Sequence, residues 1–412
     1  MQKILIISSV WVEPNSSAAG NRMLQLIDVF QSQNWQITYA STSLKSDFAV
    51  NLASLQIESS IIKINDKSFD TFITELNPTI VVFDRFIIEE QFGWRVSEIL
   101  PNCIKILDTE DLHCLRKRRQ VALKENRTFN EIDLLKSDIA KREIASILRC
   151  DLSLIISSYE MQLLKGTFRI DANLLCYVPF LLDELSNNIQ LPFFQERNHF
   201  YFIGNFLHQP NADTVLYLKK DIWPLLSKKL PKAELHIYGA YPTQQILQLH
   251  NTKERFFVKG RVENVNDTVK QYKICLAPIR FGAGLKGKLI EAMQNGTPSI
   301  TSSIGAEAMH QNLKWSGCIE NDIIKIVTAS TLLYQDKELW LTAQQNGFKI
   351  INTCYNKNDY SSHLIEVILL ISRNLSHHRT QNFMGSLLQH HTLKSTKYLS
   401  QWIEAKNKNI SK

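Results

Sequence analysis

The stretch APIRFGAGLKGKLIEAMQNGTP, residues 277–298, decides the fold that we predict for this chain. An apolar run typical of a buried strand ends in it, a loop rich in glycine and basic side chains follows, and a helix is expected to begin near Leu285. Three glycines permit a tight path that exposes backbone N–H groups, and the free N–H groups at a helix start attract anions. This order of elements indicates an open parallel α/β sheet with a ligand beyond the carboxyl end of the strand.

The charged residues of this stretch suit a diphosphate. Arg280, Lys286 and Lys288 supply cations, and the dipole of the following helix adds to their field. Glu291 lies about one turn into the expected helix, where a carboxylate can accept hydrogen bonds from the two hydroxyls of a ribose. The alternative interpretation is a glycine hinge with solvated lysines and a capping carboxylate.

Outward from this stretch, short apolar runs alternate with amphipathic segments in two series, as in parallel βαβ units. The first series predicts strands and helices in this order: strands at 3–8, 35–41, 79–84, 104–108, 152–157 and 175–179, and helices at 20–33, 131–150 and from 159. The second series predicts strands at 199–203, 234–238, 256–258, 274–278 and 298–301, helices at 211–229 and from 285, and a mostly helical chain after 322. We therefore expect two doubly wound domains, 1–182 and 199–385, a polar linker at 183–198, and a C-terminal helix within 386–412 that returns to the N-terminal domain.

The bulk composition agrees with two soluble domains and excludes several classes of protein. A length of 412 residues suits two cores, and 44% hydrophobic with 21% charged residues excludes a disordered chain. The seven cysteines form no CxxC pair, so they indicate buried or free thiols in a reducing compartment. The N-terminal apolar run is interpreted as a core strand rather than a signal peptide, which predicts a cytoplasmic protein.

The net charge of +7 fits phosphate-bearing ligands or an anionic membrane surface, and leaves peripheral membrane association open. It is too diffuse to indicate a nucleic-acid partner. The histidine pairs at 377–378 and 390–391 lack the carboxylate or cysteine spacing of a metal site, so we expect no metal there and interpret them as exposed tail residues.

Two segments of the N-terminal half are further candidates for binding. The loop EPNSSAAGNR, residues 13–22, places Gly20 at a predicted helix start but lacks the GxGxxG spacing of a dehydrogenase; otherwise it is a simple βα turn. The segment DTEDLH, residues 108–113, crowds three carboxylates beside His113 after a strand, either as a site or as a helix-start cluster. The run from Arg116 to Arg119 is interpreted mainly as a solvated helix face, with contact to an anionic acceptor or membrane as the alternative.

The stretch 277–298 resembles the retaining glycosyltransferases of family four, the group 1 glycosyl transferases of GT-B type. In that family two glutamates are separated by seven residues; the second, which holds the nucleotide ribose, falls on Glu291, whereas the first falls on Ala283. The chain is more similar to the variant branch with a Gly-Ala-Gly-x-x-x-Lys loop. The resemblance thus makes Lys288 a phosphate ligand and leaves the donor sugar to backbone groups around Gly282 and Gly284.

The resemblance extends along most of the chain. Gly204 matches the opening of the family's C-terminal domain, but Asn205 stands where many members have an arginine, and no lysine follows at the usual place. This departure shifts the phosphate role to the cations of the 277–298 stretch. Gly305 and Glu307 match a later loop near the donor. His113 matches a histidine that contacts the donor sugar, with Glu110 and Asp111 as its neighbours.

The resemblance implies a fold class and an activity: a GT-B α/β fold, with two Rossmann-like doubly wound domains facing across a cleft, an acceptor-side domain at 1–182 and a nucleotide-sugar domain at 199–385. It implies transfer of a sugar, hexosyl-like, from a nucleoside diphosphate sugar to an acceptor hydroxyl with retention and without a metal or other cofactor. The acceptor would be a glycan, a lipid-linked or a small molecule, as in surface polysaccharide or glycan assembly. The expected catalytic residues are His113 and Asp111, and the expected donor-binding residues are Gly20, Gly204, Arg280, Gly282, Gly284, Lys286, Lys288, Glu291, Gly305 and Glu307.

Two other functions are compatible with this fold. A nucleotide-sugar epimerase needs more acid and base residues in the cleft than the sequence offers. A non-catalytic nucleotide-sugar or glycan-binding protein remains the alternative, because the first motif glutamate and the arginine–lysine pair are missing. The chain contains no Asp-x-Asp, which argues against the metal-chelating GT-A class.

Overall fold

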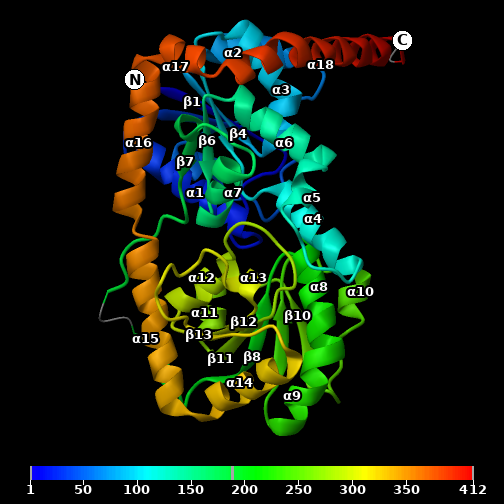
Figure 1. Ribbon diagram of the computed structural model, residues 1–412, viewed down its shortest axis with the longest axis vertical. Coiled ribbons are helices and arrows are strands. Elements are labelled where there is room, and N and C mark those ends of the chain that lie inside the picture. Colours follow the sequence, from blue (N-terminus) through cyan, green and yellow to red (C-terminus); the bar gives the residue numbers. More distant parts are fainter. Residues whose placement is uncertain (1, 187–189, 411–412) are drawn as a thin grey trace.

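A computed structural model describes residues 2–186 and 190–410, and its N-terminal domain is built on a seven-stranded parallel sheet (Figure 1). The strand order is β3-β2-β1-β4-β5-β6-β7. The strands are β1 (Lys3–Ser8), β2 (Gln36–Ser41), β3 (Glu58–Ile61), β4 (Ile80–Asp84), β5 (Ile104–Asp108), β6 (Leu152–Ile155) and β7 (Leu175–Tyr177). Every residue of β4 and β5 is buried, because helices cover both faces of the sheet, and this is why their sequences are continuous apolar runs.

The helical segments of this domain follow the strands in chain order. They are α1 (Ala18–Gln31), the short helix η1 (Leu52–Leu55), α2 (Ser68–Leu76), α3 (Phe86–Ile99), α4 (His113–Lys124), α5 (Ile132–Leu135), α6 (Asp138–Arg149), α7 (Ser158–Gly166) and η2 (Ala172–Leu174). Strand β3 and helices α2 and α3 are additions to the elements that the sequence predicted. The predicted helix over 131–150 is broken, because Ser137 caps a new helix at α6 with a hydrogen bond to the N–H of Ala140.

The C-terminal domain repeats the doubly wound pattern on a six-stranded parallel sheet, with the order β10-β9-β8-β11-β12-β13. Its strands are β8 (Asn198–Ile203), β9 (Leu235–Tyr238), β10 (Phe256–Gly260), β11 (Tyr272–Ala277), β12 (Ser299–Thr301) and β13 (Gly317–Ile319). Its helices are α8 (Gln209–Tyr217), the π-turn η3 (Leu218–Ile222), α9 (Trp223–Lys229), α10 (Gln244–Leu247), α11 (Val265–Val269), α12 (Gly287–Gln294), α13 (Ser303–Ala306), α14 (Ile323–Gln335) and α15 (Lys337–Cys354). The two sheets confirm the predicted α/β fold of two Rossmann-like domains.

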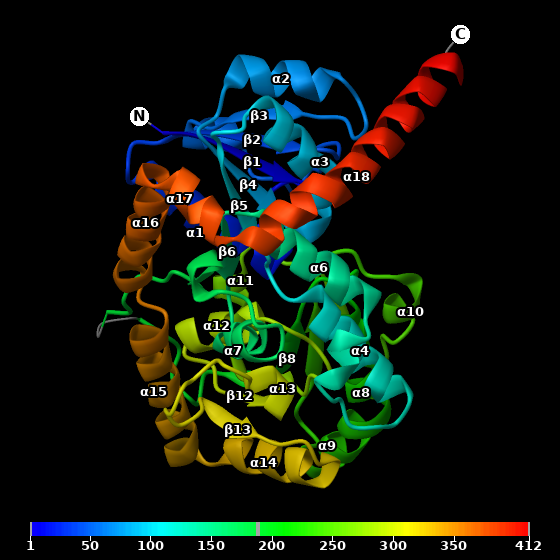
Figure 2. The same cartoon turned by 45° about the horizontal axis from the view of Figure 1, so that its top comes forward.

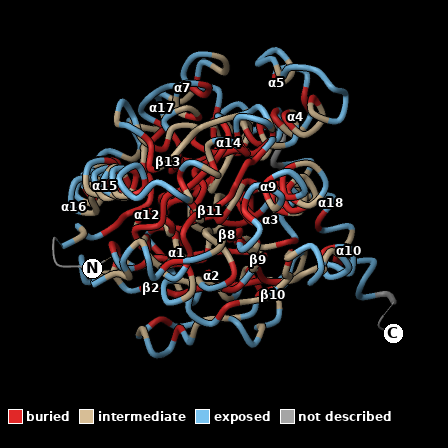
Figure 3. The backbone as a smooth tube through the Cα atoms, turned by 90° about the horizontal axis from the view of Figure 1, so that it is seen from below, coloured by how far each residue is buried: buried red, intermediate tan, exposed pale blue. Residues whose placement is uncertain are grey.

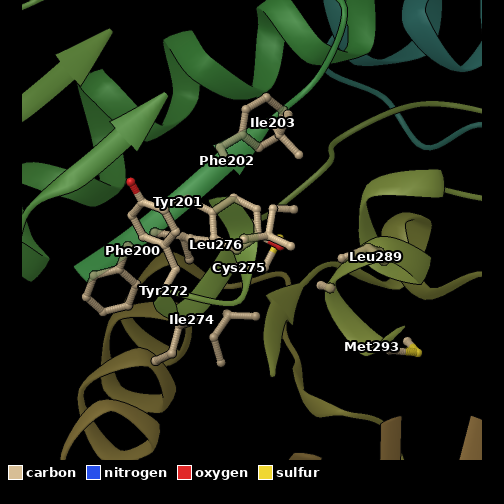
Figure 4. Packing of buried hydrophobic residues seen from close by; sticks show 14 of the residues in the cluster. Phe200, Tyr201, Phe202, Ile203, Tyr272, Ile274, Cys275, Leu276, Leu289 and Met293 are labelled. Atoms are coloured by element: carbon tan, nitrogen blue, oxygen red, sulfur yellow. The ribbon is translucent and has the colours of Figure 1, made fainter. Parts of the chain in front are cut away.

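The core of the C-terminal domain orients helix α12. Figure 4 shows Leu289 and Met293 of α12 in the same core as the buried side chains of β8 and β11. Lys288 and Glu291 lie on the other side of this two-turn helix, because positions three apart share one face. Across the whole molecule, buried positions gather around the central strands and exposed ones on the outer turns of the helices (Figure 3). The apolar contacts of α12 thus direct its two charged residues away from the core.

Three C-terminal helices lie against the N-terminal domain: α16 (Lys357–Arg373), α17 (Leu375–Gln381) and α18 (Phe383–Ile410) (Figure 1). The chain crosses between the domains where the N–H of Leu182 donates to Tyr355 O and the N–H of Lys357 donates to Leu182 O. Leu364 and Ile368 of α16 belong to one core cluster with β1 and β4, so the return to the first domain includes α16 as well as the expected terminal helix. Within the described residues, no helix has the length and apolar composition of a membrane span.

The contacts of α17 correct one detail of the sequence analysis. His378 was expected to be an exposed tail residue, but its Nε2 lies 2.7 Å from Asp151 O. The neighbouring Arg379 forms an ion pair with the Asp151 carboxylate at 2.7 Å. The side chain of His391, from the second histidine pair, lies outside the described residues.

Candidate functional site

A cleft of about 620 Å³ lies between the two domains, at the carboxyl ends of both sheets. Its walls come from the loops after β1, β4 and β5 on one side and after β8, β9 and β11 on the other. Because strands in both sheets are parallel, the loops that follow them meet at one edge of each sheet. Of the predicted site residues, the cleft is lined by Asp111, His113, Gly204, Gly282, Gly284, Lys286, Lys288 and Glu291.

The glycine-rich loop after β11 rests directly on the N-terminal domain. The backbone N–H of Gly284 donates to the Glu160 carboxylate at 2.9 Å, and Gly284 has a φ of +61°. A Cβ atom at this position would lie 2.9 Å from the Cβ of Asp111. Glycine is therefore required here both by the left-handed backbone and by the close approach of the two domains.

Lys286 and Lys288 have different hydrogen-bond partners. The Nζ of Lys286 donates to Gly284 O at 2.7 Å and to Ala283 O at 3.2 Å, so this cation holds the loop folded. Burial lowers the pKa of Lys286 to about 8. The Nζ of Lys288 donates to Asn211 Oδ1 at 2.9 Å, and burial lowers its pKa as well. Lys288 faces the cleft from the first turn of α12, where an anion would meet it.

Glu291 lies one turn beyond Lys288 on the cleft side of α12. Burial raises the pKa of its carboxyl to about 7, against the opposing attraction of Lys288. The amide of Asn21 lies 3.5 Å from its Oε1, at the limit of a hydrogen bond. In the part of the chain that the structure describes, no side chain caps the start of α12. The same part of the cleft is thus bordered by the N–H groups of the first turn of α12, by the Lys288 ammonium and by the Glu291 carboxyl. The first two attract an anion, and the third can accept hydrogen bonds.

Across the cleft, Asp111 and His113 form a small charged cluster with Arg116. His113 Nε2 lies 3.5 Å from Asp111 Oδ1, and Arg116 forms an ion pair with the same carboxylate. Burial lowers the pKa of His113 to about 4 despite the nearby Asp111, so its imidazole is neutral at pH 7. Burial raises the pKa of Asp111, but the attraction of Arg116 outweighs this effect and holds the pKa well below its usual range. A neutral ring beside a fixed carboxylate suits hydrogen bonding to a hydroxyl group.

The start of α4 is capped by two carboxyl groups from distant positions in the sequence, Glu143 and Glu160. Glu143 accepts hydrogen bonds from the N–H groups of His113 and Cys114, each at 2.9 Å. Glu160 accepts the N–H of Leu112 at 2.9 Å and, as described above, also the N–H of Gly284. These two carboxyl groups accept the otherwise unpaired N–H groups at the start of α4, which holds His113 in place. Because Glu143 and Glu160 lie far from His113 in sequence, no local pattern indicates them.

Three non-glycine residues that line the cleft, Arg85, Glu110 and Tyr241, have positive φ angles. Arg85 and Glu110 follow β4 and β5 and have φ angles of 74° and 60°, in the left-handed region. Burial, with a further contribution from Asp108, raises the pKa of Glu110 to about 8. Strained residues of this kind gather at ligand sites. The sequence signal for Arg85 was weak, because a charged residue directly after a buried strand is its only local feature.

Four predicted donor-binding residues do not line the cleft in the described chain. Arg280 is paired with Asp213 at 2.6 Å. Gly20 and Gly305 permit close packing, since a Cβ would lie 2.4 Å from Glu13 O and 1.9 Å from Thr301 Oγ1 respectively. The remaining one, Glu307, forms part of the contact between the domains.

Two groups of side-chain contacts join the domains. Arg119 donates to both oxygens of Glu307, at 2.7 and 2.6 Å, and to Gly282 O at 2.9 Å. The interpretation of Arg119 as part of a solvated face is therefore wrong, because the side chain is buried against the second domain. In the second group, the Tyr241 hydroxyl donates to Glu13 at 2.9 Å. Arg119 thus holds the glycine-rich loop against the N-terminal domain, and the Tyr241–Glu13 pair joins the loop after β9 to the same domain.

The fold has counterparts among solved structures. Sucrose-phosphate synthase from Thermosynechococcus elongatus has a TM-score of 0.67 at 14% identity, over 90% of this chain and 99% of that one. TarM from S. aureus, in complex with UDP and alpha-GlcNAc-glycerol, has 0.65 at 11% identity, with 89% and 99% covered. HepE from Anabaena, in complex with UDP and glucose, has 0.64 at 12% identity, with the same shares, 89% and 99%. No curated protein sequence matches this chain.

The two parallel sheets and the cleft at their carboxyl ends define a GT-B glycosyltransferase fold. More specifically, residues 197–336 match the model of the family described as Glycosyl transferases group 1. This matched region contains β8–β13 and the whole glycine-rich loop with Lys288 and Glu291. The chain therefore has a GT-B glycosyltransferase-like fold, and its residues 197–336 are similar to a group 1 glycosyltransferase domain.

Proposed function

We propose that this protein is a glycosyltransferase that moves a sugar from a nucleoside diphosphate sugar to an acceptor hydroxyl. The observation that carries the proposal is the arrangement of Lys288 and Glu291 on the uncapped first turns of α12, beside the glycine-rich loop and inside the interdomain cleft. The complexes of HepE with UDP and glucose and of TarM with UDP support a sugar nucleotide as donor. The donor is the substrate, and no separate cofactor is part of the proposal.

In this proposal the C-terminal domain holds the donor. The diphosphate would accept hydrogen bonds from the first-turn N–H groups of α12 and from Lys288, which is oriented by Asn211. The ribose hydroxyls would donate to the Glu291 carboxylate. Backbone groups around Gly282 and Gly284 would contact the sugar. Of the three cations predicted for the diphosphate, Lys288 has the most direct role, since Arg280 is paired with Asp213 and Lys286 holds the loop.

The chemical step requires stabilisation of the departing diphosphate. Lys288 and the dipole of α12 would stabilise its developing charge without the help of a metal ion. His113, as a neutral ring fixed by Asp111 and by the capped start of α4, would contact a hydroxyl of the donor sugar. We propose retention of the anomeric configuration, as the resemblance to the family implies. Because Asp111 is paired with Arg116 and no other carboxylate is an obvious nucleophile, the acceptor would attack on the same face as the departing diphosphate.

The acceptor would bind on the N-terminal side of the cleft. Arg85 and Glu110 line the cleft on that side, and their side chains could hydrogen-bond to the hydroxyl groups of an acceptor. A glycan, a lipid-linked or a small-molecule acceptor fits this surface, with hexosyl transfer in surface polysaccharide or glycan assembly as the proposed role. The complex of TarM with alpha-GlcNAc-glycerol and the role of WaaG in lipopolysaccharide biosynthesis support this class of acceptor.

Ligand-induced stabilisation tests the donor site first. The ligands are UDP, GDP, ADP and CMP and the sugar nucleotides derived from them. They are added to the wild type, to Glu291→Ala and to Glu366→Ala, which removes an exposed glutamate of α16 away from the cleft as a matched control. A bound ligand raises the melting temperature by mass action. We expect one nucleoside diphosphate to stabilise the wild type and the control selectively, and to have no effect on Glu291→Ala. An equal response of Glu291→Ala would remove the ribose role of Glu291.

The second candidate function is a non-catalytic nucleotide-sugar or glycan-binding protein. It is favoured by Ala283 and Asn205, which stand where the resembled family has a donor-sugar glutamate and a phosphate arginine. Mass-spectrometric detection of free or transferred sugar, with the nucleotide identified above, separates the two functions. Donor binding without any turnover over a panel of acceptors would favour the binding protein.

A further inference from the structure

Helix α18 carries an exposed apolar surface that the proposed reaction does not use. Phe383, Tyr398 and Trp402 are 72%, 63% and 60% exposed, and Met384, Leu387 and Leu399 are exposed as well. We call these six residues the α18 apolar face. Large exposed apolar patches on a folded protein mark surfaces that contact a partner.

The six residues lie on one side of the helix. Phe383, Met384 and Leu387 have the spacing i, i+1, i+4, and Tyr398, Leu399 and Trp402 repeat it farther along the same helix. At 3.6 residues per turn the two groups are rotated by only about 60° relative to each other. The opposite side of the helix contains Gly385 and Ser400, which are buried against the body of the N-terminal domain. The apolar face therefore points away from the protein.

Figures 1 and 2 show where this face lies. Helix α18 crosses the end of the N-terminal domain that is remote from the C-terminal domain, and its last turns extend beyond the rest of the molecule. Near its middle it is fixed by hydrogen bonds of the Ser400 hydroxyl to Asn65 and of Lys397 to Glu98. The helix is thus held firmly on one side and presented to solvent on the other.

The charges of α18 indicate the kind of partner. The helix contains four lysines, at positions 394, 397, 406 and 408, and a single acid, Glu404, which is buried beside Arg95. Lys394 and Lys406 are exposed among the apolar residues, and the Lys406 ammonium lies over the Trp402 ring at 5.3 Å. A second copy of α18 would bring lysine against lysine, whereas an anionic surface would meet the lysines with opposite charge.

We propose that the α18 apolar face docks the protein onto the surface of an anionic lipid bilayer. Aromatic and aliphatic side chains on one face of a basic helix enter the boundary between head groups and acyl chains, while the lysines contact anionic head groups. The helix would lie in the plane of the surface, with the N-terminal domain attached and the cleft facing the aqueous side. This inference goes beyond the proposed transferase activity and holds whether or not the protein turns over a sugar nucleotide.

Vesicle flotation with the full-length chain tests the apolar contribution. Vesicles of phosphatidylcholine with about one third phosphatidylglycerol supply an anionic surface, and vesicles of phosphatidylcholine alone serve for comparison. The exposed double variant Tyr398→Ser/Trp402→Ser is expected to lower the partition coefficient on anionic vesicles at least about ten-fold. The control Phe193→Ser removes an aromatic side chain that is 74% exposed in the segment before β8, and this variant is expected to bind as the wild type does.

The charge contribution has its own matched pair of variants. Lys394→Gln/Lys406→Gln is expected to weaken binding to anionic vesicles roughly ten-fold or more and to reduce its dependence on salt. Lys228→Gln/Lys229→Gln removes two exposed lysines of α9 and is expected to leave binding unchanged. Unchanged melting temperatures establish that the variants are folded.

Three results would overturn the proposal. They are absence of wild-type binding to anionic vesicles, binding that is equal on both kinds of vesicle, and binding that neither α18 variant weakens. Sedimentation equilibrium identifies the competing occupant: a dimer of the wild type that Tyr398→Ser/Trp402→Ser dissociates would assign the face to a second copy of this chain. Failure of these tests leaves the donor-binding results of the proposed function unaffected, because Glu291 lies in the cleft and not on α18.

Discussion

The substitution Glu291→Gln is expected to stabilise the protein while it weakens donor binding. Burial raises the pKa of the Glu291 carboxyl from its ordinary value of 4.5 to about 7. A carboxyl group whose pKa is higher in the folded state stabilises that state below its unfolded pKa, and the contribution is lost as the pH rises through the folded pKa. Near neutral pH the Glu291 carboxylate of the wild type therefore lowers the free energy of unfolding. Glutamine is uncharged and does not lower it in this way.

The magnitude follows from the two pKa values. The difference between about 7 and 4.5, at about 1.4 kcal/mol per pH unit, corresponds to about 3 kcal/mol. We expect Glu291→Gln to exceed the wild type by up to about 3 kcal/mol at about pH 8, with the difference falling towards zero as the pH approaches the ordinary glutamate pKa. Loss of Lys288's attraction to the carboxylate reduces the gain, since Lys288 stays buried.

Urea unfolding of the ligand-free protein, measured between about pH 5 and pH 8, checks this expectation. Glu366→Gln replaces an exposed glutamate away from the cleft and serves as the control, and its stability is expected to differ from that of the wild type by an amount that does not grow from about pH 5 to about pH 8. In parallel, the affinity for the identified nucleoside diphosphate is expected to fall roughly ten- to hundred-fold, because the amide accepts the ribose hydroxyls less strongly than a carboxylate. A variant that is less stable than wild type at about pH 8, or a gain that is the same at every pH, would refute the reasoning.

Three further substitutions test other parts of the site. Gly284→Ala places a Cβ 2.9 Å from the Cβ of Asp111 at a φ of +61°, so we expect a loss of about 1–2 kcal/mol in unfolding free energy and weaker donor binding; an unchanged melting temperature would contradict the close approach. His113→Ala is expected to lower kcat at least about ten-fold with little change in donor Kd, measured by steady-state kinetics and titration, and an unchanged kcat would make it a structural residue. Glu307→Gln weakens the buried bridge to Arg119 and is expected to cost about 1–3 kcal/mol and to enlarge the radius of gyration in small-angle scattering. No change in either quantity would show that this pair does not hold the domains together.

Much of the architecture was predictable from local patterns. The runs at 3–8 and 104–108 are β1 and β5 with the predicted bounds, because a strand buried on both faces requires a continuous apolar sequence. The glycine-rich loop was predictable for the same kind of reason, since its glycines and the following amphipathic helix are close in sequence. Strand β3 escaped prediction because it is a short edge strand with the sequence ESSI, which has little apolar character.

The partners of charged residues were less predictable. The sequence offered Arg280, Lys286 and Lys288 as equal cations for a diphosphate, but their nearest partners differ in the folded protein. Arg280 binds Asp213, 67 positions away in the sequence, and Lys286 donates hydrogen bonds to carbonyl oxygens of its own loop. Lys288 is held by Asn211 and lines the cleft. Which partner a charged side chain binds depends on the three-dimensional arrangement of its neighbours. Composition and sequence spacing do not give this arrangement.

The sequence by itself determined the two doubly wound domains, the glycine-rich loop and the position of Glu291 on the helix that follows. These features depend on residues that lie in the same helix or strand or in the next one along the chain. At such short sequence distances, hydrophobic periodicity and glycine content are enough to predict them. The tertiary structure alone decided that Glu160 binds the N–H of Gly284, 124 positions away, and that Arg119 is buried against Glu307 instead of solvated. The physical reason is that these contacts require two separately folded sheets to be brought together, and their free energy comes from desolvated partners that no local pattern brings into proximity.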